Sequence, residues 1–408
     1  MKKNFVLIAL LGLGALPAAA QDGAPPALNA MRLDNGALTG PGADLLLADI
    51  PAAQFILVGE DHGFADPPEI AHALAKAARP YGLVNHVVEI GPLTDEWVEA
   101  RLAEGGPDAL AKALNGRPLA MPFLGMREDA VLADYFLKNA PRRRDVLWGV
   151  DQEFIGAPLI WFERLEALAP SDTARTLAAD ALAKERDAFA MGDFGAMFMF
   201  TAAPETFAAF SAAFAGVKDA GPIIEALRES AAIYRDYNAG KNFASNVDRI
   251  ALIRREFLRQ YGTAKGPAPR VLMKMGATHL GLGTSTLSTF DLGSLTEGIA
   301  AGNGLGVLRI LILPLSGKQT TIAPSADGAF KIVDKTFELT AEILKAIGVD
   351  DAAIASEGYT VIALEPARRA LEQKKLNALT SEQRFFILGY DYLITTKSAR
   401  AATPLASK

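Results

Sequence analysis

The sequence lacks cysteine entirely and has only four histidines among its 408 residues. Without cysteine the chain can form no disulfide bond, so its stability must come from a large hydrophobic core. Hydrophobic residues make up 50% of the chain. That content is enough for one large domain or for two of ordinary size.

Positive charge is also scarce, and the formal net charge is −6. The one basic cluster, at residues 142–144, precedes a predicted strand and is interpreted as a solvated loop. A mildly acidic chain without a long basic run is a poor candidate for binding nucleic acid. We therefore expect a small-molecule substrate or ligand as the partner, and no nucleic acid.

Long apolar runs are missing except at the start, where residues 5–16 follow Lys2 and Lys3 and precede Ala18-Ala19-Ala20. A basic start, a short apolar core and an A-x-A site are typical of a secretory signal peptide, here residues 1–20. The run is too short for a stable membrane anchor. We therefore expect a periplasmic or secreted protein with no membrane anchor after cleavage.

Several common catalytic motifs are absent. The sequence contains no G-x-S-x-G, so a serine-hydrolase nucleophile is not indicated. It also contains neither H-E-x-x-H nor G-x-x-x-x-G-K-[ST], which removes the common zincin and P-loop interpretations.

What is present predicts an α/β fold. Short apolar runs alternate with helical segments, which favours a mostly parallel central sheet with helices on both faces. Residues 51–400 would form this domain, after an N-terminal extension at 21–50 that wraps the surface and before a flexible tail at 401–408. The predicted strands are 55–59, 87–90, 146–150, 271–276, 307–313, 359–364 and 390–395.

Strand patterns are missing from about residue 157 to 266, where nearly all the sequence is helical. This predicts a helical insertion over the C-terminal ends of the strands. The insertion contains a run of Met and Phe that could line a pocket for an apolar ligand, although such residues more often fill a core. The run comprises Met191, Met197, Phe198, Met199 and Phe200.

Polar residues follow four of the predicted strands at their C-terminal ends. In an open α/β sheet these ends meet at one crevice, where ligands bind. Charged groups there are costly unless they are paired, ligated or open to a ligand. The residues are Glu60 and His62 after the first strand, Glu89 in the second, Asp151 and Gln152 after the third, and His279 after the fourth.

This cluster suits either of two roles. Glu60, His62, Glu89 and His279 could hold a divalent metal, since imidazole and carboxylate are ordinary ligands. They could instead activate a water by general base catalysis. Both roles favour hydrolysis. Taken singly, each residue could also be a structural hydrogen-bonding group.

The other two histidines are left out of the site. His72 is predicted to be solvated on the first helix, and His86 begins its strand at the opposite end of the sheet.

At residues 58–63, 88–89, 148–152 and 276–279 the sequence resembles the erythromycin esterase-like superfamily, which includes ChaN-type haem-binding proteins and the TraB/Tiki group. The likeness extends over roughly residues 50–400. It implies an α/β fold with a helical insertion. In the esterases it also implies glutamates and histidines that activate a water to open a macrolide lactone.

By position in these motifs, Glu60, His62, Glu89 and His279 would take the catalytic roles. One residue, Asp61, separates Glu60 from His62, where the esterases usually have two; this spacing is closer to ChaN-type proteins. The late motif has one histidine instead of two, as in the TraB/Tiki pattern. These departures point away from macrolide hydrolysis and toward metal use.

The resemblance leaves three functions open. The first is an exported hydrolase acting on an ester, lactone or amide, with or without a metal. The second is a ChaN-like protein that binds a metal or, as the less favoured cofactor, haem. The third is a degenerate member that serves as a scaffold.

Three more residues complete the predicted substrate-binding set with Asp151 and Gln152. Asn246 and Arg249 lie on a predicted helix, residues 242–258, that the family places near the pocket; an exposed helix face is the alternative. Lys274 interrupts an apolar strand. A buried lysine needs a partner, so we expect Lys274 to face a carboxylate of the site.

Overall fold

The computed structural model describes residues 26–117, 119–140, 145–264, 268–325, 328–371 and 373–406. The predicted signal peptide and the basic cluster at 142–144 lie outside the described residues. Among the described residues, no helix is both long enough and apolar enough to cross a membrane.

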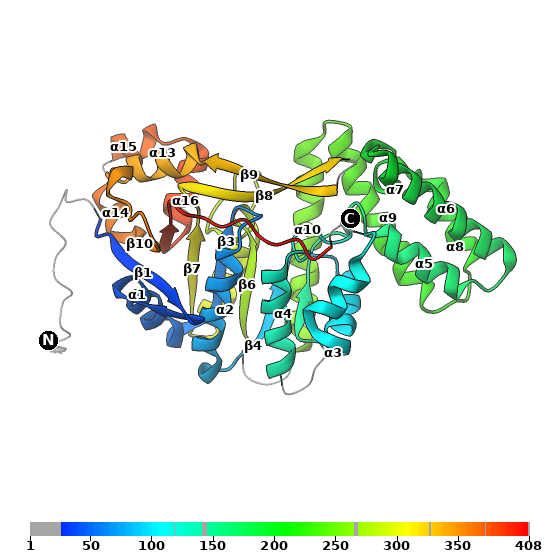
Figure 1. Cartoon of the computed structure of the whole chain (residues 1–408), viewed down its shortest axis with the longest axis horizontal. Helices are drawn as coiled ribbons and strands as arrows, with labels where there is room; N and C mark the ends of the chain where they lie inside the picture. The colour runs from blue at the N-terminus through cyan, green and yellow to red at the C-terminus, as the bar shows by residue number, and fades with distance from the viewer. Residues whose placement is uncertain are drawn as a thin grey trace, which may run out of the picture.

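A nine-stranded sheet in the order β2-β1-β10-β11-β7-β3-β6-β4-β5 forms the centre of the molecule (Figure 1). Neighbours from β11 to β5 are parallel, whereas the pairs β2–β1, β1–β10 and β10–β11 are antiparallel. The predicted α/β class with a mostly parallel sheet is therefore confirmed. The strands are β1 (Asn29–Asp34), β2 (Ala37–Thr39), β3 (Ala53–Glu60), β4 (Leu83–Val88), β5 (Leu147–Gly149), β6 (Arg270–Gly276), β7 (Gly306–Ile312), β10 (Tyr359–Ala363) and β11 (Tyr392–Thr395).

Strand β3 lies between β7 and β6, and all its residues are buried. Successive side chains of a strand point to opposite faces. Phe55 and Leu57 accordingly pack in the hydrophobic cluster on one face, and Ile56 and Val58 pack in the cluster on the other. An uninterrupted apolar run is what a strand covered on both faces requires.

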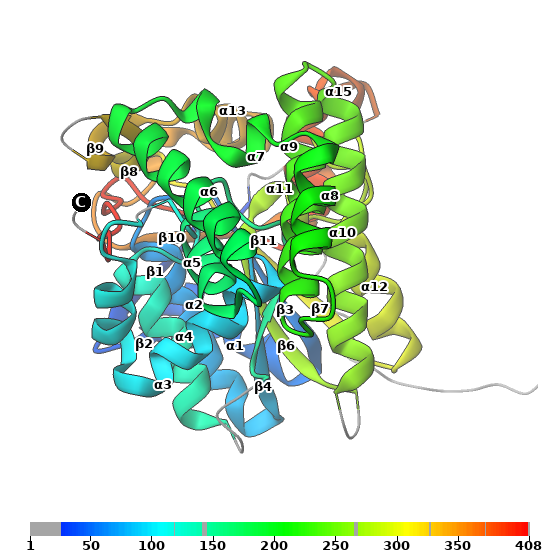
Figure 2. The ribbon, with the colours of Figure 1, turned by 90° about the vertical axis from the view of Figure 1, so that its right-hand side faces the viewer.

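Helices cover both faces (Figure 2). Residues of α2, α3 and α4 join the cluster that contains Ile56, and residues of α10, α12, α13 and α16 join the cluster that contains Phe55. Outside the insertion, the longer helices are α1 (Pro41–Asp49), α2 (Asp66–Ala78), α3 (Pro92–Leu114, broken at Gly105 and Gly106), α4 (Arg127–Asn139), α12 (Leu292–Gly302), α13 (Glu338–Ala346) and α16 (Ser381–Gly389). The shorter helices are α11 (Ala277–Leu280), α14 (Leu364–Ala370) and α15 (Gln373–Ala378).

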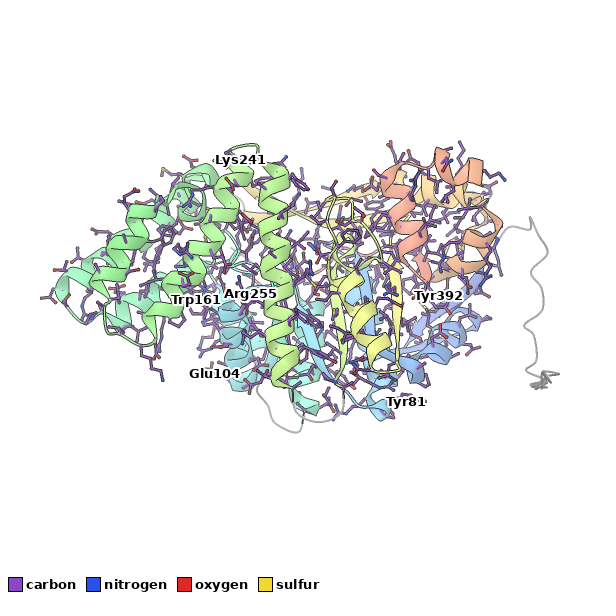
Figure 3. The ribbon with its side chains drawn as sticks, turned by 180° about the vertical axis from the view of Figure 1, so that it is seen from behind. Tyr81, Glu104, Trp161, Lys241, Arg255 and Tyr392 are labelled. Atoms are coloured by element: carbon purple, nitrogen blue, oxygen red, sulfur yellow. The ribbon has the colours of Figure 1, made fainter. Side chains whose placement is uncertain are left out.

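The helical insertion extends beyond the β5 edge of the sheet, and its last helix runs back beside the sheet (Figures 1 and 3). In Figure 3, Trp161 of α5 lies on the insertion side, Arg255 lies on α10, and Tyr392 of β11 lies toward the other end. The insertion comprises α5 (Pro158–Leu168), α6 (Asp172–Met191), α7 (Phe198–Thr201), α8 (Pro204–Ala213), α9 (Ala220–Asn238) and α10 (Asn242–Thr263).

The Met and Phe run of the insertion is mainly core. Met197 and Met199 are fully buried, and Phe198 packs edge to face against Phe162. Met191 is 73% exposed. Met197, Phe198 and Met199 therefore have the packing role that was the alternative to an apolar ligand pocket.

Two boundary predictions were wrong. Residues 29–39 do not wrap the surface before the first strand, because β1 pairs with β10 and β2 pairs with β1. Residues 401–406 are not a flexible tail, because Ala402 and Ala406 are buried and Pro404 forms a bridge to Met126. Both segments are held in place by backbone pairing with other parts of the chain. Their side chains form no clear apolar pattern from which this pairing could be predicted.

A long hairpin was not predicted. Strands β8 (Ser316–Ser325) and β9 (Gly328–Thr336) pair with each other outside the main sheet. The hairpin lies across the top of the molecule in Figure 1. Alternating polar and apolar residues around the Asp-Gly pair at 327–328 were the available signal.

Candidate active site

Four neighbouring parallel strands deliver the predicted site residues to one edge of the sheet. Glu60 is the last residue of β3, and Glu89 directly follows β4. Asp151 lies just after β5, and His279 lies on α11, which directly follows β6. Because β5, β4, β6 and β3 are adjacent in that order, the side chains that follow them converge.

Glu89 lies at the centre of the cluster and is buried. Its Oε1 accepts a hydrogen bond from Nη2 of Arg249 at 3.2 Å, and its Oε2 accepts one from the backbone N–H of Gly276 at 2.7 Å. Nε2 of His279 lies 3.5 Å from Oε1, and Nε2 of His62 lies 3.6 Å from Oε2. One carboxylate thus faces two imidazoles.

His62 is the accessible member of the cluster. Its side chain is 31% exposed, whereas those of Glu60 and Glu89 are each 3% exposed. Nδ1 of His62 lies 2.9 Å from Oε1 of Glu60, and the ring of Phe123 stacks on the imidazole at 4.1 Å. Burial lowers the pKa of His62, but Glu89 and Glu60 outweigh burial and raise the pKa above its usual value.

His279 forms a second pair with an acid that sequence reasoning missed. Its Nδ1 lies 2.6 Å from Oδ2 of Asp291, and both side chains are buried. Asp291 also caps α12 by accepting a hydrogen bond from the N–H of Leu292 at 2.7 Å. Burial lowers the pKa of His279, but the charge and hydrogen bond of Asp291 outweigh burial, so the pKa is raised overall. An aspartate directly before a helix was the available signal.

Lys274 faces a carboxylate of the site, Glu60, with its Nζ 2.5 Å from Oε1. Nζ also lies 2.8 Å from Oδ1 of Asp129, a buried residue of α4 that sequence reasoning missed. Burial raises the pKa of Glu60, but Lys274 and His62 outweigh burial and lower the pKa overall. Burial raises the pKa of Asp129 to about 6, although Lys274 opposes this.

Arg249 connects the insertion to the sheet. From α10 its guanidinium binds Asp151 through Nε at 2.9 Å and through Nη2 at 2.5 Å, in addition to its contact with Glu89. Burial raises the pKa of Asp151, but Arg249 outweighs burial and lowers the pKa overall, so the carboxylate stays ionised. A planar fork of this kind fixes a carboxylate in orientation as well as in charge.

The other two residues predicted to bind substrate are less well connected. Gln152 is buried beside Tyr234 of α9, and its Oε1 has no hydrogen-bond partner among the described residues. Asn246 lies one turn before Arg249, partly exposed, and makes no side-chain hydrogen bond within the described part of the chain.

The two excluded histidines lie outside the cluster. His86 is buried, with Nδ1 3.2 Å from the carbonyl oxygen of Leu272. The prediction that His72 is solvated was wrong, because its ring packs at 4.6 Å from that of Tyr135 and its Nε2 is buried. Burial lowers the pKa of His72 to about 4.

A cavity of about 550 Å³ borders Glu60, His62 and Gly276. Its far wall is formed by Leu313 and Pro314 after β7, by the segment 335–340, and by α16. The β8–β9 hairpin fixes the loop beside it. Nε2 of Gln319 donates a hydrogen bond to the carbonyl oxygen of His62 at 2.7 Å, and the N–H of Thr320 donates one to that of Gly63 at 2.9 Å.

The cluster does not fit a resident divalent metal. Among the described residues, no group of three or more His, Asp or Glu side chains is arranged to hold a metal ion. Glu60 is already paired with Lys274, and Glu89 with Arg249. A metal bound to these carboxylates would face the cations of Lys274 and Arg249, which repel it. The predicted metal set of Glu60, His62, Glu89 and His279 is therefore better explained as an ion-pair network.

No protein-family model matches the sequence, and no curated protein matches it. Solved structures do match. A histidine-to-asparagine variant of the erythromycin esterase EreC, in its open conformation, superposes with a TM-score of 0.59 at 14% identity, covering 91% of this chain and 98% of that one. A succinoglycan biosynthesis protein superposes with a TM-score of 0.53 at 13% identity, covering 92% of this chain and 95% of that one. The resemblance to the erythromycin esterase-like proteins is thus confirmed at the level of the fold.

Proposed function

We propose that the protein is a hydrolase in which His62 activates a water against an ester, lactone or amide. The observation that supports this most is the orientation of His62. Its Nδ1 contacts Glu60, its Nε2 faces Glu89, and the residue borders the cavity. The likeness to EreC supplies a fold on which esterase chemistry occurs, while the chemistry itself is argued from this site.

Glu60 selects the form of His62 that can act as a base. A carboxylate beside Nδ1 holds the proton there, so that Nε2 of the neutral ring carries the lone pair. Nε2 then takes a proton from water as the water attacks the carbonyl carbon, and Glu60 stabilises the imidazolium that forms. The imidazolium returns this proton to the leaving alcohol or amine as the bond between the acyl carbon and that group breaks. Lys274 keeps Glu60 ionised for this purpose.

Glu89 and His279 complete the arrangement. A water to one side of Nε2 of His62 and Oε2 of Glu89 would lie within hydrogen-bonding reach of both, because these atoms are 3.6 Å apart. Arg249, Gly276 and His279 hold the carboxylate of Glu89 in this orientation. We assign His279, which is buried behind Glu89, the role of positioning it.

Turnover is tested with a panel of neutral p-nitrophenyl esters, lactones and anilides in water enriched in ¹⁸O. Hydrolysis by an activated water places one ¹⁸O in the acid product. His279→Ala is expected to lose turnover while keeping the circular dichroism spectrum of the wild type. A fully active His279→Ala enzyme would reject the positioning role of His279, and a wild type inert on every class in the panel would reject the proposed hydrolysis.

We also propose that the protein acts after export. The support is the sequence pattern of residues 1–20. Expression in a Gram-negative host, followed by fractionation and determination of the mature N-terminus, tests this. A chain that starts at Gln21 outside the cytoplasm agrees with the proposal, and an intact cytoplasmic chain contradicts it.

The ChaN-like haem-binding alternative stays a prediction. Purified protein that shows no Soret band and takes up no added haem would reject it.

A further inference from the structure

The cavity beside His62 extends away from the helical insertion. Glu60, His62 and Gly276 form one wall, and the residues after β7, β9 and in α16 form the opposite wall. A volume of about 550 Å³ is ordinary for a small-molecule pocket. A carbonyl group placed at Nε2 of His62 would therefore direct one of its substituents into this space.

The opposite wall presents apolar side chains that core packing holds in place. Leu313, Phe337 and Phe386 are buried in the fold while lining the cavity. The ring of Phe337 packs edge to face on Phe64 at 5.4 Å, and Leu339 is half-buried beside it. Side chains held by core packing form a preformed surface. An apolar group that binds there loses its contact with water, and little conformational entropy of the protein is lost because these side chains are already ordered.

The mouth of the cavity is acidic. Asp61, Glu338 and Glu382 line it, and Glu338 and Glu382 are exposed. The one lysine among the lining residues, Lys335, has its Nζ 3.2 Å from Oε1 of Gln319 and 4.7 Å above the ring of Phe337. A substrate that carries a carboxylate would meet more negative than positive charge here, an effect that salt weakens.

The insertion offers no comparable surface in its Met and Phe run, because Met197 and Met199 are buried in its own core. Phe243, at the start of α10, is 63% exposed and is an apolar residue of the insertion outside this cavity.

We infer that this cavity, and not the helical insertion, selects the substrate, and that the substrate is an ester or lactone with an apolar acyl or alkyl group and no negative charge. The inference rests on the proposed function for the reaction that takes place at His62. Its claim about which groups bind in the cavity is separate and can be tested without turnover. The segment 335–340 and α16 are then the specificity elements.

The test separates binding from turnover. Phenyl alkyl ketones of increasing chain length resemble esters but cannot be hydrolysed, and calorimetry on the whole protein gives their dissociation constants. Affinity is expected to rise roughly threefold to fourfold per methylene buried. Leu339→Asp should abolish this increase, whereas the matched variant Phe243→Asp should keep it.

A second substitution guards against misfolding of Leu339→Asp. Leu339→Trp adds no charge but narrows the cavity, so it should weaken binding of the long ketones more than that of acetophenone. For charge, kcat/KM for p-nitrophenyl butyrate should exceed that for the p-nitrophenyl monoester of succinic acid. Glu338→Lys combined with Glu382→Lys should reduce this preference, most clearly at low salt.

The outcomes distinguish the two proposals. The inference would be overturned if the affinity of the wild type for the ketones did not depend on chain length. It would also be overturned if this dependence were lost in Phe243→Asp and kept in both Leu339 variants, even if esters are hydrolysed. Ketone binding with the expected dependence, but with no hydrolysis of any ester, would support the cavity assignment and reject the proposed reaction.

Discussion

Nζ of Lys274 lies 2.5 Å from Oε1 of Glu60 and 2.8 Å from Oδ1 of Asp129, so one buried ammonium binds carboxylates from β3 and from α4. Burial lowers the pKa of Lys274, but Asp129 and Glu60 outweigh burial and raise the pKa overall, so the lysine stays charged. Because Glu60 also contacts His62, this ion-pair cluster orients the acid that would position the catalytic base.

Lys274→Met is expected to destabilise the fold by about 3–5 kcal/mol, because it leaves two buried carboxylates without their cation. Urea unfolding followed by circular dichroism measures this. Lys241→Met is the control, since the side chains of Lys241 and its partner Asp236 are 65% and 33% exposed. The control should change stability by at most about 1 kcal/mol. Equal effects of the two substitutions would contradict the role given to Lys274.

Glu185, in the insertion, predicts a pH dependence of stability. Burial raises its pKa from 4.5 to about 7, and its Oε1 has no hydrogen-bond partner among the described residues. A raised pKa means that the folded state holds a proton which the unfolded state has released. The contribution of this group to stability is therefore lost as the pH rises from about 4.5 to about 7.

Glu185→Gln removes this dependence. Relative to the wild type, the variant should gain on the order of 3 kcal/mol in free energy of unfolding between pH 4.5 and pH 8. The exposed Glu205 supplies the control Glu205→Gln. A parallel pH dependence in the wild type and Glu185→Gln would show that Glu185 does not hold a proton in the fold.

Asp291→Asn tests the partner of His279. Asparagine can still cap α12, but it breaks a buried ion pair, so we expect the melting temperature to fall as well. It replaces a carboxylate by an amide beside Nδ1 of His279, which removes the charge that favours the protonated form of His279 and so weakens its hold on Glu89. Because Asp291 acts only through the position of Glu89, we expect kcat to fall by roughly 10- to 100-fold. Unchanged kcat together with an unchanged melting temperature would remove Asp291 from the account.

Metal removal should leave hydrolysis unchanged. Glu60 and Glu89 already have cationic partners in Lys274 and Arg249, so the site needs no divalent ion to neutralise it. Dialysis against EDTA, followed by elemental analysis and rate measurement beside a His62→Ala variant, checks this. A near-stoichiometric metal that disappears in His62→Ala, with activity restored by one divalent ion, would contradict the ion-pair interpretation.

The sequence predicted those parts of the fold and the site that a single local pattern of residues determines. Strand β3 reads as an apolar run that ends at Glu60, and the same logic placed Glu89, Asp151 and His279 at the same edge of the sheet. Lys274 was identifiable because a charge inside an apolar strand requires a partner. Arg249 was found only through the family resemblance, since its helical text also suits an exposed face.

Other parts depend on contacts between distant segments. Asp129 reads as an ordinary acid in the first turn of α4, and nothing local connects it with Lys274. The N-terminal strand β1 and the C-terminal residues 401–406 are held by backbone pairing, for which their side chains give a weak signal. The cavity wall at 335–340 follows the hairpin that the sequence analysis overlooked.

The most direct measurement for the central claim is kcat/KM of His62→Gln on the best neutral ester, beside His72→Gln. Both substitutions remove an imidazole, but His72 packs on Tyr135 outside the cluster. If His62 is the base that activates water, His62→Gln should lose about 10²–10⁴-fold. His72→Gln should stay within about twofold of the wild type, because general base catalysis does not involve it. A His62→Gln enzyme as active as His72→Gln would contradict the account.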